Sequence, residues 1–167
     1  MKNFLQTSQV LIGMGSNLGD RKEHIEKAIE HLSHREVVCL KRASLYHSDP
    51  IGNADQSFIN TAILCSTTLK PLALLRCLLD AELSLGRVRK IHWGNRCIDL
   101  DIILWENPDN SMLSFESEGL SIPHPRALER DFVMVPCAEI APDWLFPGES
   151  TTLKKICEQK RFYLNSI

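Results

Sequence analysis

Hydrophobic residues recur along the chain with two different periods, and each change of period marks an expected element. Val10–Ile12 is a short hydrophobic run that predicts a buried strand, which ends in a glycine-rich turn over residues 13–19. Hydrophobic residues then follow helical spacing. Asp20 stands at the expected N-cap position, and Glu23 follows three residues later. These signals predict a helix from residue 21 to residue 33.

Three more strands and a second helix follow. Residues 37–46 and 58–67 are two β-rich runs that we expect to pair as a hairpin across the loop at residues 48–53. A leucine-rich segment begins at Pro71 and ends at Gly86, which is the typical placement of proline and glycine around a helix. Residues 99–105 predict the last of these strands.

The resulting order, β-α-β-β-α-β, predicts an α+β fold of the ferredoxin-like type, with an antiparallel sheet and the helices on one face. Additions follow toward the C-terminus: short strands around Met112 and Leu120, a short helix after Pro125, and a terminal helix over residues 153–159. With 167 residues, of which 44% are hydrophobic, the chain is long enough for one core. We therefore expect a single domain over residues 1–167.

Composition excludes several classes of protein. The formal net charge of −2 does not favour non-specific binding to nucleic acid. The six cysteines are scattered without a C-x-x-C pair, which indicates reduced thiols and no zinc site. No hydrophobic run near the N-terminus is long enough for a signal peptide or a membrane span. We expect a cytoplasmic monomer without a nucleic-acid or membrane partner.

The strongest chemical signal is a cationic loop that leads into a strand with two aspartates. Because side chains alternate along a strand, Asp99 and Asp101 are expected on one face, roughly 7 Å apart. Two such carboxylates repel each other, and a pair of Mg2+ ions shared with phosphates would remove the conflict. The loop supplies cations for phosphate oxygens, namely Arg87, Arg89, Lys90 and Arg96. The alternative is a surface strand whose acids pair with these arginines.

A second group of residues suggests a pocket for a small molecule. Phe58 and Asn60 are two residues apart on a predicted strand, so both side chains should project to the same face. An aromatic ring beside an amide suits a flat heterocycle that forms hydrogen bonds. A core phenylalanine beside a satisfied polar residue is the alternative.

Known nucleotide-binding motifs do not fit. The glycines at positions 13, 15 and 19 are one residue off the dinucleotide-binding fingerprint, and the chain has no G-x-x-x-x-G-K-[ST] sequence. If ATP binds, metals and side chains must hold its phosphates.

A series of short motifs follows in order along the chain: GSNLGDR, DPIG before F-x-N, GRVRK, WG-x-R-x-x-DLDI, IPHPR, ERDFV and EIAP. Together these motifs resemble the 6-hydroxymethyl-7,8-dihydropterin pyrophosphokinase family. The resemblance covers roughly residues 12–146. It implies a ferredoxin-like fold, ATP as co-substrate with two Mg2+ ions, and transfer of the β,γ-diphosphate to the hydroxymethyl group of 6-hydroxymethyl-7,8-dihydropterin, which releases AMP. The family acts in folate biosynthesis.

The resemblance also implies roles for single residues on the nucleotide side. Asp99 and Asp101 would hold both magnesium ions, and Arg87 and Arg96 would neutralise the transferred phosphates. The remaining nucleotide-side positions are Glu82 along the nucleotide, Arg89 and Trp93 on a mobile loop, Ile102 beside the adenine, and His124 and Arg130 at the phosphates or ribose.

On the pterin side, the resemblance implies that Asn60 reads the edge of the ring and that Phe58 and Phe132 sandwich it. Ser48 and Ile51 would offer backbone groups. Two positions depart from the family pattern. Asn95 replaces a proline, which should loosen the cationic loop, and Leu79 replaces a polar residue near the adenine.

Three other functions were weighed against this one. An RNA-binding module would need exposed aromatic residues on the sheet and a basic face. A pterin or nucleotide sensor would have no need for two metal-binding carboxylates opposite arginines. An enzyme with the same phosphate apparatus and a different acceptor, such as a nucleoside or a modified pterin, is disfavoured by Asn60 and the two phenylalanines.

Overall fold

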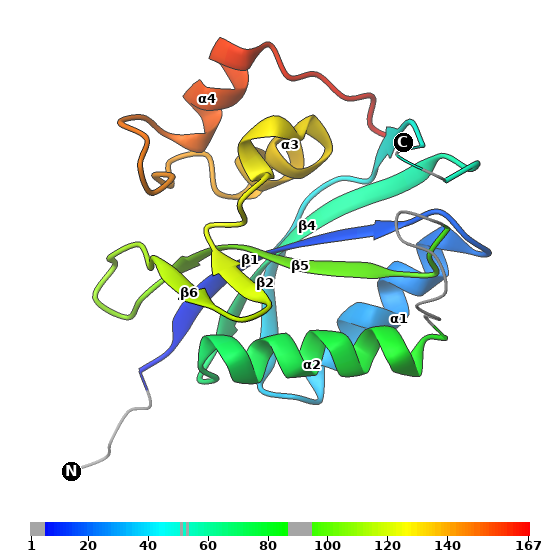
Figure 1. Cartoon of the computed structure of the whole chain (residues 1–167), viewed down its shortest axis with the longest axis horizontal. Coiled ribbons are helices and arrows are strands. Elements are labelled where there is room, and N and C mark those ends of the chain that lie inside the picture. Colours follow the sequence, from blue (N-terminus) through cyan, green and yellow to red (C-terminus); the bar gives the residue numbers. More distant parts are fainter. Residues whose placement is uncertain (1–5, 51, 53, 87–94) are drawn as a thin grey trace.

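The computed structural model describes residues 6–50, 52, 54–86 and 95–167 of the chain. Its centre is an antiparallel sheet in which neighbouring strands follow the order β2-β4-β1-β5, with β3 also paired to β4 (Figure 1). The strands are β1 Ser8–Ser16, β2 Val37–Arg42, β3 Tyr46–Ser48, β4 Phe58–Thr67 and β5 Asp99–Glu106. An antiparallel sheet with helices was predicted, and the order of its elements follows the predicted one.

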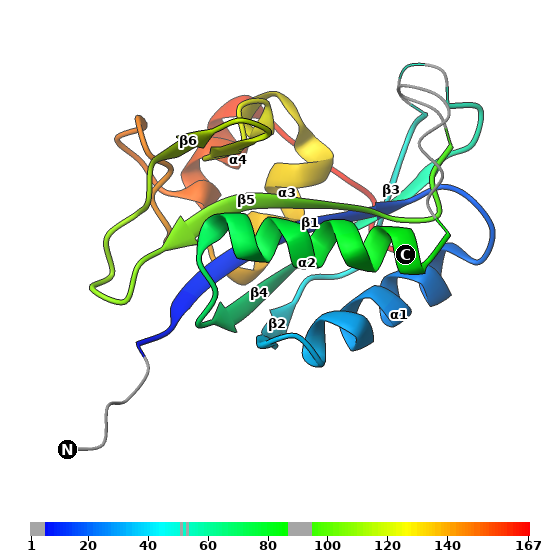
Figure 2. The same cartoon turned by 60° about the horizontal axis from the view of Figure 1, so that its bottom comes forward.

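Two helices cover one face of this sheet. Helix α1 spans Arg21–Ser33 and α2 spans Pro71–Ser84, and both lie along the same side in Figures 1 and 2. Asp20 caps α1 by accepting a hydrogen bond from the N–H of Glu23 at 3.0 Å. The helices pack on alternate residues of β1, and the shared buried residues are Val10, Ile12, Met14, Ile25, Ala28, Leu32, Leu74, Leu78 and Ala81. We call this side the α1 face.

The opposite side, here called the α3 face, is also covered. Helix α3 spans Asp131–Ile140 and α4 spans Leu153–Lys160, and both lie across the sheet from α1 and α2 (Figure 1). Leu11 of β1 and Met134 of α3 belong to a second hydrophobic cluster there. Helices on one face were predicted, and this holds for α1 and α2 alone. The C-terminal additions turn the fold into a sheet between two helical layers.

Strand β1 is longer than predicted. The expected turn at residues 13–19 is wrong for its first part, because pairing with β4 and β5 continues through Gly13 and Gly15. Glycine is a poor strand former, and its presence inside a strand often marks a place where another group approaches closely. Here the neighbouring strands on both sides supply the hydrogen bonds, which offsets the low intrinsic preference.

The predicted strand over residues 37–46 is divided into β2 and β3. Both pair with β4 as expected, and β2 carries an irregularity between Cys39 and Lys41. The break between β2 and β3 is explained by hydrogen bonds to a side chain of α3, which is distant in the sequence. Glu139 of α3 accepts from the N–H and the hydroxyl of Ser44 at 2.8–3.1 Å, and it also accepts from the hydroxyl of Tyr46. A side chain thus takes the place of a strand partner.

The C-terminal additions agree with the prediction in part. The expected strands are present as β6 Phe115–Ser117 and β7 Leu120–Ile122, which form a separate two-stranded sheet. Met112 makes only an isolated bridge to Glu106. A 3-10 turn at Ala127–Glu129 precedes α3, which is longer than the short helix expected after Pro125.

All six cysteines are free thiols. Within the part of the chain that the structure describes, no helix has the length and hydrophobicity needed to cross a membrane.

The packing of α2 against the sheet can be tested with two leucines of the same helix. Leu78 is fully buried, whereas the side chain of Leu83 is 64% exposed. We expect Leu78→Ala to lower the free energy of unfolding by about 2–5 kcal/mol, since it leaves a cavity under the sheet. Leu83→Ala should change it by no more than about 0.5 kcal/mol. Urea unfolding followed by circular dichroism measures both. Equal effects would contradict the assignment of the buried face.

Candidate active site

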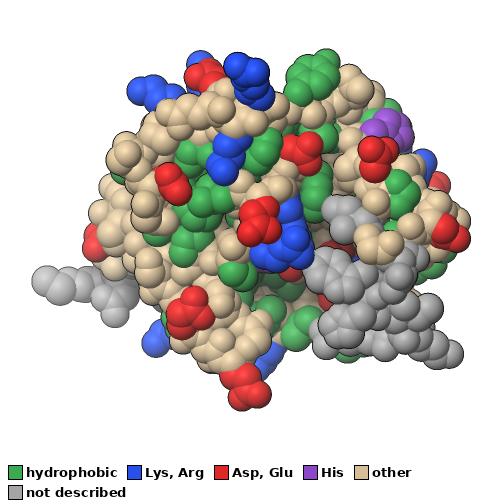
Figure 3. All heavy atoms as spheres, turned by 45° about the horizontal axis from the view of Figure 1, so that its top comes forward, with side chains coloured by type: hydrophobic (Ala, Val, Ile, Leu, Met, Phe, Trp, Pro, Cys, Tyr) green, Lys and Arg blue, Asp and Glu red, His purple; other side chains and the backbone are tan. Residues whose placement is uncertain are grey.

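An open cavity lies on the α3 face. Strands β1, β4 and β5 form its floor, and the start of α3 forms one wall. Figure 3 shows acidic and basic side chains meeting beside hydrophobic ones on this side of the molecule. The lining residues are Gly13, Met14, Gly15, Ser48, Phe58, Asn60, Thr61, Arg96, Asp99, Asp101, Ile103, Arg130, Phe132 and Val133.

Strand register brings the polar residues of this cavity into line. Gly15 lies opposite Asn60 of β4 on one side and opposite Asp99 of β5 on the other. Gly13 lies opposite Asp101. Residues directly opposite each other in an antiparallel pair share a face. A carboxylate side and an amide side are therefore separated by two glycines of β1, which carry no side chains.

The two glycines are needed for this space. A β-carbon at Gly15 would lie 3.1 Å from the Oδ1 of Asn60 and 3.6 Å from the ring of Phe58. A β-carbon at Gly13 would lie 3.3 Å from the side chain of Ile103. Larger residues would thus crowd the floor between the amide and the carboxylates.

Asp99 and Asp101 both line the cavity, as their alternation along β5 predicted. Arg96 forms an ion pair with Asp99, with 2.8 Å between Nη1 and Oδ2, and both side chains are mostly buried. The ion pair that was weighed as an alternative is therefore present. It does not place the acids on an outer surface, because the same carboxylates face the cavity.

The amide side has an aromatic corner. Asn60 is 4% exposed, and its Nδ2 donates to the hydroxyl of Ser48 at 2.7 Å. Phe58 lies on the same strand and lines the same cavity, while Phe132 approaches from α3. Two rings and an oriented amide, taken from β4 and α3, suit a flat heterocycle with hydrogen-bonding edges.

Cations face the acids from the segment before α3. The guanidinium of Arg130 lies 5.7 Å from the ring centre of Phe132. Burial lowers the pKa of Arg130, and the nearby charge of Arg126 adds to this, while Asp101 and Asp99 act in the opposite direction. Arginine nevertheless stays charged, so Arg130 is a partly desolvated cation beside two carboxylates.

His124 is held as a neutral imidazole. Burial lowers its pKa most, and the charge of Arg130 lowers it further, so the ring carries no charge at pH 7. The Nδ1 accepts a hydrogen bond from the N–H of Arg126 at 3.2 Å. The proton of a neutral ring must then be on Nε2, which can donate to a phosphate or ribose oxygen.

Three predicted site residues do not line the cavity. Glu82 is 2% exposed between α2 and β5, where its carboxylate accepts from the N–H of Leu100 at 2.8 Å. The side chain of Ile102 is buried on the α1 face, so it can offer a ligand only backbone groups. His124 lies after β7, and its N–H donates to the carbonyl of Ile103. The proposed roles of Arg87, Arg89, Trp93 and Ile51 concern positions outside the described residues.

Sequence reasoning missed two kinds of residue. Gly13 and Gly15 were assigned to a turn, although isolated glycines at alternating positions of a strand already suggest a close approach of another group. Asn17 was not considered at all. It is fully buried and joins the segments that precede β4 and β5, as its hydrogen bonds to Gln56 and Arg96 show. No local pattern in the sequence indicates this role.

The expectation that Asn95 loosens the cationic loop concerns positions outside the described residues. Asn95 itself is fixed, because its side chain is hydrogen-bonded to Asn17 and Asp55. Leu79 belongs to α2, and the missing polar group near the adenine stays a prediction.

The arrangement suits chemistry on a phosphate chain. Mg2+ prefers oxygen ligands and is usually held by one or two carboxylates together with phosphates and water. Asp99 and Asp101 on one face fit such a metal. Within the described ranges, no group of three or more His, Cys, Asp or Glu residues gathers around a possible metal position. Arg96 and Arg130 would face the phosphate oxygens.

Comparison with known proteins identifies the same family that the sequence motifs resemble. The family model described as 7,8-dihydro-6-hydroxymethylpterin-pyrophosphokinase (HPPK) matches residues 11–142. A relative named 2-amino-4-hydroxy-6-hydroxymethyldihydropteridine pyrophosphokinase from Bacillus subtilis is 44% identical over 131 residues, which is 77% of this chain and 75% of the relative. A relative of the same name from Methylorubrum extorquens is 39% identical over 145 residues, which is 86% of this chain and 89% of the relative.

Solved structures agree in fold. The HPPK-DHPS protein of Plasmodium falciparum in its crystal structure with pteroate matches 92% of this chain with a TM-score of 0.70 at 13% identity. The match covers only 42% of that longer chain. The resemblance inferred from the motifs is confirmed, since the family model matches well over half of the sequence: this chain belongs to the 7,8-dihydro-6-hydroxymethylpterin-pyrophosphokinase family.

Proposed function

We propose that this chain transfers the β,γ-diphosphate of ATP to the hydroxymethyl group of 6-hydroxymethyl-7,8-dihydropterin, giving AMP and the pterin diphosphate in folate biosynthesis. Membership of the pyrophosphokinase family supports the reaction. The observation that carries the assignment to this site is the single cavity that joins an aromatic and amide corner to a pair of carboxylates.

The phosphate side would work by positioning and by stabilising charge. The hydroxymethyl oxygen of the pterin attacks the β-phosphorus and loses its proton to water, and the bond from that phosphorus to the oxygen shared with the α-phosphate breaks, so that AMP leaves with this oxygen. Arg96 and Arg130 would meet the negative charge that spreads over the phosphate oxygens. Neutral His124 would donate a hydrogen bond through Nε2.

Asp99 and Asp101 would hold Mg2+, and we propose two ions. Bound there, magnesium would neutralise phosphate charge and hold the phosphate chain in place. Arg96 pairs with Asp99 in the structure. With Asp99 holding a metal ion, this ion pair would weaken, and the guanidinium of Arg96 would be available to a phosphate oxygen.

The pterin side would select the acceptor. Asn60 has one amide hydrogen committed to Ser48, which fixes the orientation of the amide group. Its carbonyl oxygen and second amide hydrogen would then match the edge of a pterin, while Phe58 and Phe132 would contact the two ring faces. Ser48 and Ile51 stay proposed as backbone contacts.

Other features of the assignment are also proposals. The strand order, with both helices of the β-α-β-β-α-β unit on one face, supports a ferredoxin-like arrangement. Roles for Glu82 and Ile102 near the nucleotide, and for Arg87, Arg89 and Trp93 on the cationic loop, rest on the family resemblance. A single domain, a monomeric state and a cytoplasmic location are likewise proposed.

The reaction itself has a direct test. Purified protein with ATP, Mg2+ and 6-hydroxymethyl-7,8-dihydropterin should release AMP, as resolved by chromatography, with controls that lack the pterin or contain EDTA. ADP as the product would indicate ordinary phosphoryl transfer. Tight pterin binding without turnover would favour the sensor function instead.

The metal assignment predicts a large effect on turnover with little effect on folding. We expect Asp99→Ala and Asp101→Ala each to lower kcat on the order of a thousandfold, because a metal ligand contributes several kcal/mol. Thermal unfolding should change little, since each substitution removes like-charge repulsion, which for Asp99 offsets the lost ion pair with Arg96. Glu106→Ala, at the other end of β5, is the matched control. Near-normal AMP formation by either aspartate variant would rule out the assignment.

The pterin assignment predicts an effect confined to one substrate. Asn60→Ala should weaken binding of 6-hydroxymethylpterin, the oxidised analogue, about 10–100-fold, because hydrogen bonds to a buried amide are lost. ATP affinity should stay within about twofold. Isothermal titration calorimetry measures both. The control is Thr67→Val at the other end of β4, because this residue lies outside the cavity lining and its hydroxyl donates to the carbonyl of Glu36. Equal losses for both ligands would place the pterin elsewhere.

A further inference from the structure

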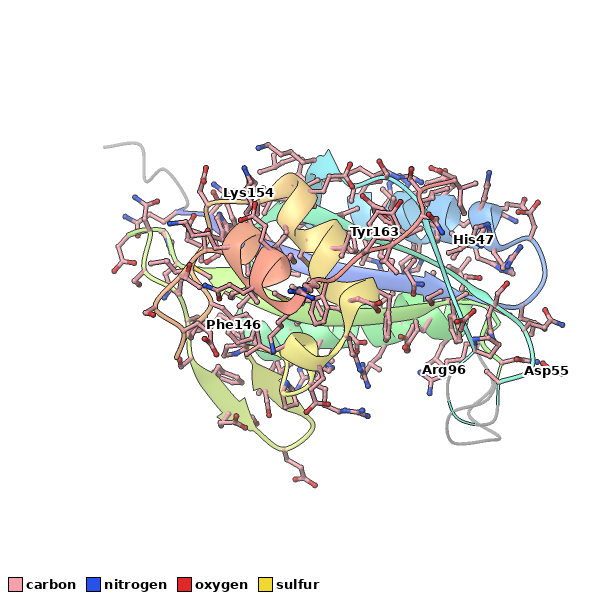
Figure 4. The ribbon with its side chains drawn as sticks, turned by 90° about the horizontal axis from the view of Figure 1, so that it is seen from above. His47, Asp55, Arg96, Phe146, Lys154 and Tyr163 are labelled. Atoms are coloured by element: carbon pink, nitrogen blue, oxygen red, sulfur yellow. The ribbon has the colours of Figure 1, made fainter. Side chains whose placement is uncertain are left out.

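The segments that lead into β4 and β5 are tied together by side chains outside the cavity. We call residues 54–57 the β4 approach and residues 95–98 the β5 approach. The β4 approach leads to Phe58 and Asn60, and the β5 approach leads to Asp99. Asp55 and Arg96 lie at the same end of the molecule in Figure 4. A link between the two approaches therefore connects the proposed pterin side of the cavity with its proposed phosphate side.

Asn17 is the first part of this link. It follows β1 directly and is fully buried. Its Oδ1 accepts from the N–H of Arg96 at 2.6 Å, and its own N–H donates to the carbonyl of Arg96 at 3.1 Å. The Nδ2 donates to the carbonyl of Gln56 at 3.1 Å. One side chain thus holds the backbone of both approaches.

Asn95 is the second part. Its Oδ1 accepts from the Nδ2 of Asn17 at 2.9 Å and faces the N–H of Asp55 at 3.4 Å. Its Nδ2 donates to the carboxylate of Asp55 at 2.5 Å, a short bond to a charged acceptor. A proline at this position could make none of these side-chain bonds. In this chain, hydrogen bonds from Asn95 therefore hold the backbone at a position where the family pattern has a proline.

The consequence is largest for Arg96. This residue is adjacent to Asn95, its backbone is held on both sides by Asn17, and its guanidinium reaches Asp99 inside the cavity. A shift of the β5 approach by a fraction of an ångström would move the guanidinium away from the phosphate position. Catalysis by positioning is sensitive to such shifts.

We propose that Asn95 is a positioning residue for the diphosphate transfer, which acts through Asn17 and Asp55 to keep the pterin side and the phosphate side in mutual alignment. The inference rests on the proposed function. Asn95 itself is not among the residues that line the cavity. Asn95 donates a hydrogen bond to Asp55 and accepts one from Asn17. The alignment therefore depends on which of positions 95 and 55 carries the amide and which carries the carboxylate.

That arrangement can be reversed. N95D places a second carboxylate against Asp55. The substitution removes the amide donor and adds repulsion between the two carboxylates. D55N keeps a weaker, neutral hydrogen bond. The double variant N95D/D55N exchanges the two groups, so that position 55 donates and position 95 accepts from both Asn17 and position 55. N107D makes the same chemical change just beyond the other end of β5 and is the matched control.

We expect N95D to lower kcat/KM for ATP and for the pterin together by about tenfold, which corresponds to the loss of one hydrogen bond to a charged group. D55N should cost about threefold, and N95D/D55N should return to within about threefold of the unmodified protein. N107D should stay within twofold. The assays follow AMP formation at 25 °C, and circular dichroism and thermal unfolding verify that every variant is folded.

The outcomes separate this inference from the function. Without AMP formation by the unmodified protein, the proposed function is wrong. With an active unmodified protein, constants for N95D within twofold would overturn the positioning role. So would a double variant that is no better than N95D, or a defect that simply follows the fraction of unfolded protein.

Discussion

The site depends on an absence of side chains in the middle of the sheet. β1 is the central strand, with β4 on one side and β5 on the other, and on the α3 face it presents Gly13 and Gly15 where its neighbours present Asn60, Asp99 and Asp101. A strand with ordinary side chains at these two positions would fill the space and bring the floor up to the level of the amide. The two glycine positions of β1 separate the amide side from the carboxylate side and leave a shared volume above them.

The other face of the same strand does the opposite. Val10, Ile12 and Met14 alternate with the glycines and are buried beneath α1 and α2. Burial of hydrophobic area there stabilises a strand whose glycines weaken it. Glu82 adds a polar tie, because its carboxylate accepts from the backbone of β5 next to Asp99. From Ile12 to Gly15, β1 thus packs one face against helices and opens the other to the cavity, a division that the period-two geometry of a strand makes possible.

Local patterns were sufficient to predict α1 and α2 and the order of the main elements along the chain. Asp20 and Pro71 mark helix starts by capping and by a fixed backbone angle, and both effects act within a few residues. Alternation along β5 likewise predicted that Asp99 and Asp101 share a face. Features set by distant contacts were not predictable in this way. The division of β2 from β3 depends on Glu139, and the covering of the α3 face depends on a second hydrophobic cluster.

Strand order also has a consequence for the way the protein is made. β1 is synthesised before its two partners, β4 and β5, which follow much later in the chain, with β2 and both helices of the α1 face between them. Contacts between residues far apart in sequence form slowly, because the intervening chain must first be ordered. The wall contributed by α3 comes later still. A nascent chain that ends before residue 99 would have an amide side but no carboxylate side, so the cavity is complete only after β5 and α3 have been made.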